Sequence, residues 1–532
     1  MSRLIVTAAP PTSNGDLHIG HLSGPYLGAD VFARARRQLG DDVLLVSYSD
    51  DNQSYVQRKA LQQGTTPSAI ARRFGTTIAD TLLKSNIKLD HFLYSLDNPI
   101  LVNALHRFYE AAKADNVLSR KEAEIPYFDT YQVWGYEAFA RGSCPNCGGS
   151  TDTSQCESCA FPPVIEDMTD IRCILDGSAA RKRKVEQIFL DIEAHRPLLT
   201  KLCEHAKFRP QLAAFMDEVL SQPMRPWAIS RPHDYGPPVP DDPSATLHTW
   251  FGGIAGYYAT SQEWAKKIGQ PERWRDYWEN PECGIVHFIG FDCSFSHAVV
   301  YPSLLSHLPM APSVIQIFTN KFLLLQGHGF STSRGLAIWA NEFLDYVEAD
   351  ALRYFLALNA PETQETNFDL ADFQRTINTD LHDVFAQAIT ALESNRMAVA
   401  AEVGIVEERL NPLRTTFLQA CSVEDFSLTT MAKVLQSIIG LIRRAKPAEL
   451  YPLLAVYATV AQALQPSFSK QLARYLRLPK SWGRDWLLTG KGLRELSPLA
   501  SSADGRPEFA RVSDSVVRKF QHVIDSLTLT PA

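Results

Sequence analysis

Two histidines lie three residues apart in the run Asn14-Gly-Asp-Leu-His18-Ile-Gly20-His21, which follows a short apolar run and opens a helical pattern. Backbone N–H groups at the start of a helix attract anions, and imidazoles at this spacing lie on neighbouring faces of the helix. Gly20 has no side chain, so a flat ring can approach the backbone there. The place of this run, at a strand-to-helix turn behind two prolines, favours a binding site over histidines that merely satisfy a turn.

Four cysteines form two pairs, Cys144-Pro-Asn-Cys147 and Cys156-Glu-Ser-Cys159. Two chelating pairs at this spacing can close a tetrahedral thiolate site, and we predict a zinc ion there. The ion should be structural, because four protein ligands leave no open position for catalysis. The alternatives are disulfides, which cytosolic chains rarely form, or four unused thiols.

The first elements that must position these residues form a βαβ unit. Residues 3–9 and 43–48 are compact runs rich in β-branched side chains, and each is bounded by turn signals. A helical pattern from Leu22 to Leu39 lies between them and ends at Gly40. This order is typical of a parallel sheet covered by helices, so we expect an α/β protein with a Rossmann-type parallel sheet.

Residues 118–225 change in character, with a Cys/Gly-rich knot, a basic run and then amphipathic helices. Strand-like runs at 285–290 and 314–325 restore the first pattern, so an insertion interrupts the sheet domain. From about Ala371 the periodicity is helical, which predicts a helix bundle. The expected regions are residues 1–117 and 226–325 as the two halves of the sheet domain, 118–225 as an insertion with a zinc knuckle at 144–159, 326–370 as a connecting region, and 371–532 as the bundle.

The composition is that of an ordinary soluble globular protein, with 45% hydrophobic and 21% charged residues in a chain of 532. The net charge of -7 means that a nucleic-acid partner would have to meet a local basic patch. Basic runs at 181–184 and 443–446 are as readily solvated helix faces as phosphate contacts. The sequence has no signal peptide or membrane-length apolar run, so we expect a cytoplasmic protein.

The segment PPTSNGDLHIGHL resembles the signature of class I aminoacyl-tRNA synthetases, and the Asn-Gly before the histidines is similar to the methionyl-tRNA synthetase branch. This resemblance implies that His18 and His21 bind ATP phosphates and that adenine stacks on Gly20, with Asn14 beside them. LLVSYSDDNQ resembles the family's strand that ends in a carboxylate for the substrate amino group, here Asp50. A carboxylate at the carboxyl edge of a sheet suits an ammonium ion.

Further motifs follow in the family's order from residue 4 to about 395. WAISR resembles an arginine-bearing turn, which makes Arg231 a candidate partner for Asp50, and TWFGGIAGYY resembles the amino-acid pocket. HFIGFD resembles the motif in which Asp292 takes the ATP ribose and Gly290 allows close backbone approach. The family also carries a zinc knuckle in its insertion. The substrate pocket that the resemblance implies comprises Ala9, Pro10, Thr12, Asp50, Arg231, Trp250, Gly253, Tyr257, Cys293, Ser296 and His297.

The chain departs from the family in the mobile loop that reads Lys-Met-Ser-Lys-Ser, which falls in the region 326–370 that contacts the tRNA stem. Gly329 and Thr332 stand at the lysine positions, and Phe291 replaces a third lysine. In the family these cations meet the departing pyrophosphate, and losing one such donor costs about 3–4 kcal/mol of transition-state stabilisation. Ser331, Ser333 and Arg334 remain as the expected catalytic residues of this degenerate loop; Arg334, Lys321 and His328 are nearby candidate cations.

The expected amino-acid pocket departs from the family as well. Pro10 and Thr12 replace a leucine and a tyrosine, Gly253 opens a Gly-Ile in place of Ala-Pro, and Ser296 replaces a phenylalanine. These changes predict a wider and more polar pocket, which favours a larger or more polar substrate than methionine. In the helical region, Gln387 and Ala391 stand where the family has anticodon-reading Asn and Arg, so anticodon reading is doubtful.

Four functions are compatible with these observations. The first is a repurposed synthetase that uses ATP (with Mg), forms an aminoacyl-adenylate from an amino acid other than methionine, and passes the acyl group to tRNA or a small acceptor. The alternatives are a transferase that consumes aminoacyl-tRNA without ATP, an ordinary methionine–tRNA ligase, and a catalytically silent binding protein. The chain ends without the tRNA-binding extension of some dimeric relatives, so we expect a monomer.

Overall fold

The computed structural model of the protein describes residues 2–232, 235–330, 337–394, 403–493 and 505–528. Its central sheet has five parallel strands in the order β15-β14-β1-β2-β3. β2 and β3 lie on one side of β1, and β14 and β15 lie on the other. In open parallel sheets this change in strand order creates a ligand crevice at the carboxyl ends of the strands. The predicted α/β class is therefore confirmed. The strands are β1 (Arg3–Ala8), β2 (Asp42–Ser49), β3 (His91–Tyr94), β14 (Gly284–Gly290) and β15 (Ser313–Asn320).

The predicted first helix begins at Ile19, earlier than Leu22, and runs as α1 (Ile19–His21), a π-helical stretch η1 (Leu22–Tyr26) and α2 (Leu27–Leu39). It ends at Gly40, whose φ of 104° is the left-handed conformation that glycine adopts without strain. The helix end that the sequence signalled is therefore found.

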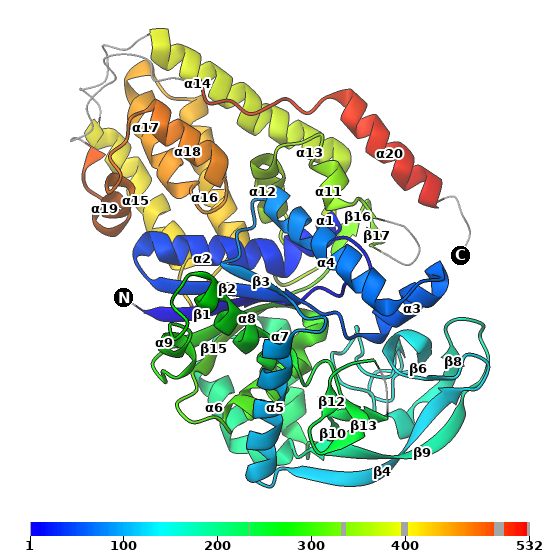
Figure 1. Cartoon of the computed structure of the whole chain (residues 1–532). Coiled ribbons are helices and arrows are strands. Elements are labelled where there is room, and N and C mark those ends of the chain that lie inside the picture. Colours follow the sequence, from blue (N-terminus) through cyan, green and yellow to red (C-terminus); the bar gives the residue numbers. More distant parts are fainter. Residues whose placement is uncertain (1, 233–234, 331–336, 395–402, 494–504, 529–532) are drawn as a thin grey trace.

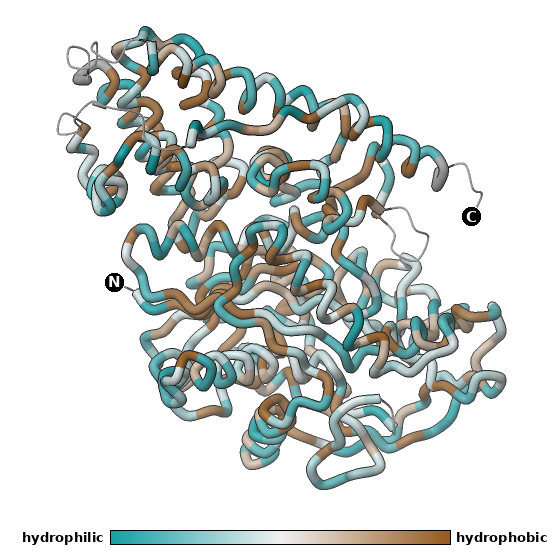
Figure 2. The backbone as a smooth tube through the Cα atoms, turned by 45° about the horizontal axis from the view of Figure 1, so that its top comes forward, coloured by the Kyte–Doolittle hydropathy of each residue, from teal (hydrophilic) through white to brown (hydrophobic). Residues whose placement is uncertain are grey.

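The two faces of the sheet bury two different apolar cores. Val6 of β1 faces α2 and the C-terminal helices, whereas its neighbour Ile5 faces α5 (Pro99–Ala114) and α8 (Gly253–Lys267). This alternation follows from the two-residue repeat of a strand. In Figure 2 the apolar colour follows the strands through the middle of the molecule.

The insertion is built mainly on strands. β4 (Leu118–Phe128) pairs antiparallel with β9 (Arg181–Leu190), and the basic run 181–184 begins β9 rather than lying on a helix. Lys184 Nζ donates to Glu122 Oε1 at 2.7 Å, so this run is partly neutralised by the neighbouring strand. The other elements of the insertion are β5 (Val133–Trp134), η2 (Glu137–Phe139), β6 (Ala140–Ser143), β7 (Ser150–Thr151), η3 (Ile165–Asp167), β8 (Thr169–Cys173), η4 (Glu193–His195), α6 (Arg196–His205) and α7 (Pro210–Ser221).

The remaining elements complete the sheet domain and connect it to the bundle. They are α3 (Ser54–Gln63), α4 (Pro67–Lys84), β10 (Trp227–Ala228), β11 (Ser230–Pro232), β12 (Pro238–Val239), β13 (Asp242–Leu247), α9 (Arg275–Trp278), η5 (Phe291–Cys293), η6 (Ser296–Val300), α10 (Tyr301–Leu305), β16 (Leu323–Leu325), β17 (His328–Gly329), α11 (Ala340–Phe343), α12 (Ala349–Leu358) and β18 (Thr366–Phe368).

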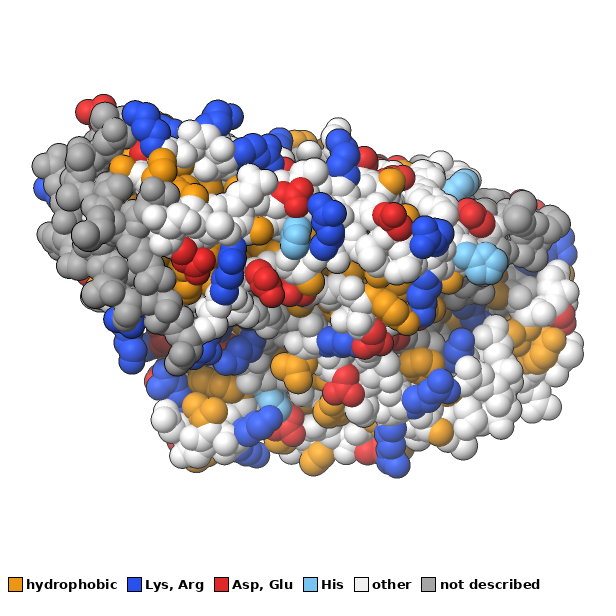
Figure 3. Space-filling view, turned by 90° about the horizontal axis from the view of Figure 1, so that it is seen from above, with side chains coloured by type: hydrophobic (Ala, Val, Ile, Leu, Met, Phe, Trp, Pro, Cys, Tyr) orange, Lys and Arg blue, Asp and Glu red, His pale blue; other side chains and the backbone are white. Residues whose placement is uncertain are grey.

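The predicted helix bundle is present, and it packs on the α2 side of the sheet (Figure 1). On the face seen in Figure 3 the basic and acidic side chains are interspersed. In the basic run 443–446, Arg443 Nη2 lies 3.0 Å from Asp380 Oδ1. No helix among the described residues is long and apolar enough to cross a membrane. The bundle comprises α13 (Leu370–Thr376), η7 (Ile377–His382), α14 (Asp383–Ser394), α15 (Val403–Ala420), α16 (Leu428–Arg443), α17 (Pro447–Val460), α18 (Pro466–Tyr475), α19 (Trp482–Thr489) and α20 (Asp514–Thr528).

Candidate functional site

The segments that follow three neighbouring strands meet at the carboxyl edge of the sheet. After β1, Ala9 N donates to Phe288 O of β14 at 3.0 Å, and Thr12 pairs with Asp50 at the end of β2. Gly290 ends β14 and leads directly to Asp292. The parallel sheet therefore brings together residues that the sequence placed in three separate motifs.

His18 and His21 form a reciprocal pair at the start of the first helix. Each Nδ1 accepts a hydrogen bond of 3.2 Å from the backbone N–H of the other residue, and the two rings stack at 3.6 Å. Burial lowers the pKa of both imidazoles, that of His21 to about 4, so both are neutral at pH 7. With Nδ1 accepting, the ring proton lies on Nε2, and each histidine is a hydrogen-bond donor rather than a cation.

A flat ring does approach Gly20, and it belongs to Phe330. The Phe330 ring stacks on His18 at 4.6 Å, and a Cβ placed on Gly20 would lie 2.9 Å from it and 3.0 Å from His18 Nδ1. A side chain at position 20 would therefore clash, which explains the need for glycine. The prediction that adenine occupies this surface is left untested.

Asp50 is buried at the end of β2, with a relative exposure of 4%. Its carboxylate accepts hydrogen bonds from Thr249 Oγ1 at 2.6 Å and from the Gln53 side chain. Burial raises the pKa of Asp50 to about 7, and the nearby carboxylates of Glu137 and Asp51 oppose its ionisation further. A nearby cation would stabilise the charged form of this carboxyl group, as expected of a residue that anchors a substrate amine.

The expected pairing of Arg231 with Asp50 is wrong. Arg231 instead donates to the buried Glu137 and, at 3.3 Å, to Ser154 Oγ. Burial opposes ionisation of Glu137, but Arg231, His248 and a hydrogen bond from Ser54 hold its pKa at about 2. Because Arg231 already has a carboxylate partner in the insertion, Asp50 keeps its own charge available for a ligand.

The wall of the expected amino-acid pocket is polar. Tyr257 Oη lies 3.1 Å from His297 Nε2, and Ser296 Oγ lies 3.0 Å from His297 Nδ1. The Tyr301 ring packs on His297 at 4.4 Å. The expected widening at Gly253 is not found, because the Tyr301 hydroxyl occupies the position where a Cβ on Gly253 would lie. The pocket gains a hydroxyl there rather than free volume.

Two more of the predicted pocket residues lie at its margins. Trp250 is half-buried, with its ring 5.3 Å from that of His248. Burial, together with the charges of Asp292 and Asp50, raises the pKa of the Cys293 thiol. The thiol is therefore protonated at neutral pH.

The expected ribose site combines a glycine and a carboxylate. A Cβ on Gly290 would collide with the Asp292 carboxylate, so glycine is required for this close approach. Burial raises the pKa of Asp292 to about 6, with help from Glu157 and Asp152. The Gln155 side chain donates to the Asp292 carbonyl, which ties this loop to the insertion.

A cation stands beside Phe291, where the family has a lysine. Gly290 and Asn320 pair across β14 and β15, so the residues that follow them are neighbours. Lys321 Nζ lies 4.1 Å from the centroid of the Phe291 ring. His328 and Gly329 are exposed on β17. Ser331, Thr332, Ser333 and Arg334 lie outside the described residues, so their expected roles stay predictions.

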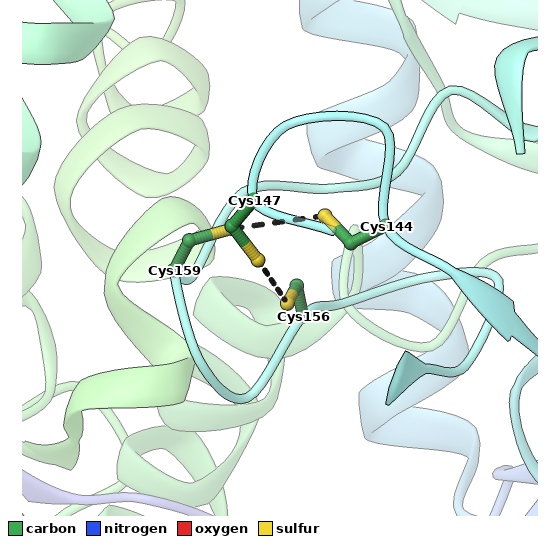
Figure 4. A group of neighbouring side chains, drawn as sticks. All are labelled: Cys144, Cys147, Cys156 and Cys159. Carbon is green, nitrogen blue, oxygen red and sulfur yellow. Dashed lines mark hydrogen bonds between the residues drawn. The ribbon is translucent and has the colours of Figure 1, made fainter. Parts of the chain in front are cut away.

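The four knuckle cysteines come together as predicted (Figure 4). Cys144 and Cys159 Sγ atoms are 3.8 Å apart, those of Cys147 and Cys156 are 3.6 Å apart, and all four lie within 4.8 Å of one another. Zinc–sulfur bonds of about 2.3 Å in a tetrahedron place sulfurs about 3.8 Å apart, so the donors fit a zinc ion. These separations are also too long for the roughly 2.05 Å bond of a disulfide.

Sequence reasoning missed several residues of the site. Glu137, Ser154 and Gln155 reach it from the insertion, and Tyr301 reaches it from the start of α10. Lys321, by contrast, was among the candidate cations that the sequence suggested. Ser154 and Gln155 could have been found from their place between the two cysteine pairs. A short loop that a metal holds at both ends projects its middle residues in a fixed direction. Nothing in the sequence marked the buried carboxyl of Glu137.

Comparisons with known proteins agree with this geometry. A family model described as tRNA synthetases class I (M) matches residues 4–391. Methionine–tRNA ligase of Roseiflexus castenholzii is 33% identical over 392 residues, covering 71% of this chain and 66% of the relative. That of Chlamydia caviae is 31% identical over 403 residues, covering 75% and 72%.

The fold also matches a solved structure, Mycobacterium tuberculosis methionyl-tRNA synthetase in complex with methionyl-adenylate. The TM-score is 0.72 at 17% identity, covering 96% of this chain and 100% of that chain. The chain spans about two thirds of the length of the Roseiflexus relatives. The match to the family model over most of the sequence shows that the chain belongs to the methionyl branch of the class I tRNA synthetase family.

Proposed function

We propose that the protein activates an amino acid with ATP, forming an aminoacyl-adenylate, and transfers the acyl group to an acceptor. The observation that carries this proposal is the convergence of the His18–His21 pair, Asp50 and the Gly290–Asp292 turn at one edge of the sheet. A solved relative of the same fold is described as a complex with methionyl-adenylate. ATP would enter as its magnesium complex, as is usual for phosphoryl substrates.

Each group has a distinct role in this reaction. The Nε2–H groups of His18 and His21 donate to the phosphates, and the Asp292 carboxylate accepts from the ribose hydroxyls. Asp50 holds the substrate ammonium, which directs the substrate carboxylate toward the α-phosphorus. A carboxylate oxygen then attacks that phosphorus, and pyrophosphate leaves.

Lys321 is the cation that we assign to the departing pyrophosphate. Its ammonium lies over the ring of Phe291. Phe291 follows the neighbouring strand β14 and occupies the position of the family's lysine. An aromatic face attracts an ammonium ion by about 0.5–2 kcal/mol, so Phe291 helps to fix Lys321 in place. A cation here favours an activating enzyme over a transferase, since a transferase has no pyrophosphate to stabilise.

The substrate that fits the pocket is more polar than methionine. Ser296 and Tyr301 present hydroxyls, and His297 links them to Tyr257. These groups already bond to one another and to the Cys293 carbonyl, and a thioether adds no strong hydrogen bond to them. A substrate side chain that forms hydrogen bonds with them would gain about 0.5–1.5 kcal/mol for each bond, and would be selected over methionine to that extent.

The four-cysteine cluster would hold a structural zinc ion, which supplies no catalytic chemistry because its coordination is complete. Its effect on the reaction would be indirect. The loop between the cysteine pairs carries Ser154 and Gln155, which contact Arg231 and the Asp292 backbone.

Pyrophosphate exchange into ATP, measured across a panel of amino acids, tests the proposal. We expect exchange with a polar amino acid and weak or absent exchange with methionine. Lys321→Ala should lower exchange by about 10²-fold, the usual effect of removing one transition-state donor, and Lys321→Arg should restore part of it. Lys267→Ala, at the exposed end of α8, is the matched control.

Other outcomes would replace the proposal. Robust exchange with methionine and charging of methionine tRNA would assign the ordinary ligase. Exchange with no amino acid, together with turnover of a charged tRNA, would assign the transferase. The absence of any adenine-nucleotide binding would favour a silent protein.

A further inference from the structure

The side chain of Asp50 is held by two donors that come from different elements. Thr249 Oγ1, in the turn between β13 and α8, donates to Asp50 Oδ1 at 2.6 Å. The side chain of Gln53, the N-cap residue of α3, donates to Asp50 Oδ2. The backbone is fixed as well, because Asp50 N donates to Pro11 O at 2.9 Å. Each carboxylate oxygen therefore has one protein donor, and its remaining lone pairs can accept from a ligand.

The turn that carries Thr249 is fixed by its own hydrogen bonds. Trp250 N donates to His248 Nδ1 at 2.9 Å, and Gly252 N donates to Thr249 O at 3.0 Å. His248 N donates to Ile229 O at 2.8 Å, which ties the turn to the neighbouring strand segment. All these partners belong to the protein itself, so the Thr249 hydroxyl is in place before a substrate binds.

The charges around Asp50 oppose its ionisation. Burial is the largest of the effects that raise its pKa to about 7, and the carboxylates of Glu137 on η2 and of Asp51 raise it further. Arg231 is engaged by Glu137. The hydrogen bonds from Thr249 and Gln53 act in the opposite direction and lower the pKa of Asp50.

The other titratable groups around Asp50 are uncharged at neutral pH. Burial raises the pKa of the nearby tyrosines and thiol above the usual range, and it lowers that of the nearby imidazole. These groups are Tyr48 of β2, His248 of the Thr249 turn, Cys293 of η5 and Tyr301 of α10. The two hydroxyl and amide donors therefore have to favour the carboxylate without help from these side chains.

We propose that Thr249 is a positioning residue for amino-acid binding, because its hydroxyl holds the Asp50 carboxylate in its charged form and in one orientation. A hydrogen bond to a carboxylate is stronger than one to a neutral carboxyl group, so the donor favours the charged form. The inference rests on the proposed function, in which Asp50 holds the substrate ammonium. Thr249 acts through Asp50, so its loss should weaken amino-acid binding and leave the chemical step unchanged.

The first test measures the ionisation of Asp50 itself, by NMR of the carboxyl carbons in the zinc-loaded full chain with isotopically labelled aspartate. Asp50→Asn identifies the signal. Thr249→Val keeps the shape of the side chain but removes the donor, so the midpoint of the Asp50 titration should rise by about one to two pH units. Thr249→Ser keeps a hydroxyl and should return the midpoint most of the way.

Thr260→Val is the matched control. It also removes a buried threonine hydroxyl, which donates to Gly256 O at 2.7 Å within α8, and it should leave the Asp50 midpoint unchanged. Circular dichroism and an unchanged AMP affinity establish that each threonine variant is folded around an intact nucleotide site.

The second test measures pyrophosphate exchange as a function of pH, with the amino acid that supports the strongest exchange. At pH 7 the KM of Thr249→Val for that amino acid should rise about 5- to 50-fold, because the ionised fraction of Asp50 falls from about one half to about one tenth or less. The kcat at saturating amino acid should change by less than about twofold. The defect in KM should shrink as the pH rises, which a loss of packing would not produce.

Each remaining outcome decides against the inference. An unchanged Asp50 titration in Thr249→Val, or a KM that rises equally at every pH, overturns the role of Thr249 and leaves the proposed function intact. A raised midpoint with an unchanged KM shows that Asp50 does not hold the amine, which also overturns the role of Thr249. Exchange with no amino acid in the unmodified protein overturns the proposed function, and the role of Thr249 falls with it.

Discussion

The insertion and the C-terminal bundle pack against opposite faces of the same sheet, yet they relate to the candidate site in different ways (Figure 1). The insertion sends Glu137, Ser154 and Gln155 into the site, where they contact Arg231 and the Asp292 backbone. The bundle meets the sheet domain through the apolar core around α2. The contacts of the insertion therefore link it to the residues of the candidate site, whereas the contacts of the bundle with the sheet contribute to the stability of the fold.

The two regions also differ in what holds them together. The knuckle end of the insertion rests on two small clusters, one of which is Phe128, Phe139, Ala140 and Cys173. Clusters of this size rarely order a loop on their own, so we expect the knuckle to depend on a bound metal for its order. The bundle shares one extended apolar core with the sheet and needs no such cross-link.

Removing the metal should have the largest effect, because a structural zinc contributes about 10–16 kcal/mol to the folding of its site. Cys144→Ser should abolish stoichiometric zinc and AMP binding while far-UV circular dichroism keeps most of its helical signal. Metal analysis and calorimetry measure both. Cys203→Ser changes a thiol on α6 outside the cluster and should keep the zinc. Unchanged AMP affinity in a zinc-free Cys144→Ser protein would contradict the coupling.

The next largest effect concerns the bundle side. Arg353 is buried on α12 and pairs with Asp30 of α2 at 2.7 Å. It also donates to the carbonyls of Leu464 and Ala463. Arg353→Ala breaks these contacts and should lower the free energy of unfolding by about 3–5 kcal/mol.

AMP affinity measured on the folded Arg353→Ala protein should be unchanged, since the pair lies outside the site. Arg375→Ala removes an exposed ion pair with Asp372 in the bundle and should cost less than about 0.5 kcal/mol. Denaturant unfolding gives both values. Loss of AMP binding at full folding would show that the bundle is coupled to the site after all.

A smaller change tests the contact between the insertion and the site. Glu137→Gln keeps the shape of the side chain but removes the charge that pairs with the buried Arg231. We expect a loss of about 2–3 kcal/mol in stability and a fall in AMP affinity, because Arg231 also holds Ser154 beside Gln155. Glu122→Gln changes an exposed carboxylate on β4 and should affect neither quantity. Equal effects of Glu137→Gln and Glu122→Gln on AMP affinity would show that the contact between Glu137 and Arg231 does not link the insertion to the site.

The sequence predicted the parts of the fold that local patterns specify. The alternation of strands and helices gave the parallel sheet, and Gly40 marked the end of the first helix. The cysteine spacing predicted the cluster, because two Cys-x-x-Cys pairs bring four sulfurs together whatever surrounds them. The basic run 181–184 was misjudged, since charge alone does not distinguish a strand from a helix face.

What the sequence could not supply were contacts between distant segments. Arg231 was matched to Asp50 by family analogy, whereas Glu137, at the start of η2, occupies that role in three dimensions. A glycine at 253 predicted empty space, but the Tyr301 hydroxyl fills it from another helix. Compensation of this kind depends on packing between elements, which no single motif records.

The smallest expected effect is a pH dependence of amino-acid binding that separates the sheet edge from both flanking regions. Burial raises the pKa of Asp50 to about 7, and the carboxylate form is the one that attracts a substrate ammonium. Below that pKa most of Asp50 is protonated, so the affinity should fall by up to about tenfold for each pH unit lost. As the pH rises through 7 the affinity should increase and then level off, until the substrate's own amine deprotonates.

Calorimetry with the amino acid that supports exchange, at pH values from about 5.5 to about 8.5, would measure this dependence. This range extends at least about one pH unit to either side of the pKa of Asp50. Asp50→Asn should bind weakly and independently of pH. A pH dependence that survives in Asp50→Asn would place the titrating group elsewhere, with Asp292 next to be tested because its pKa is raised to about 6.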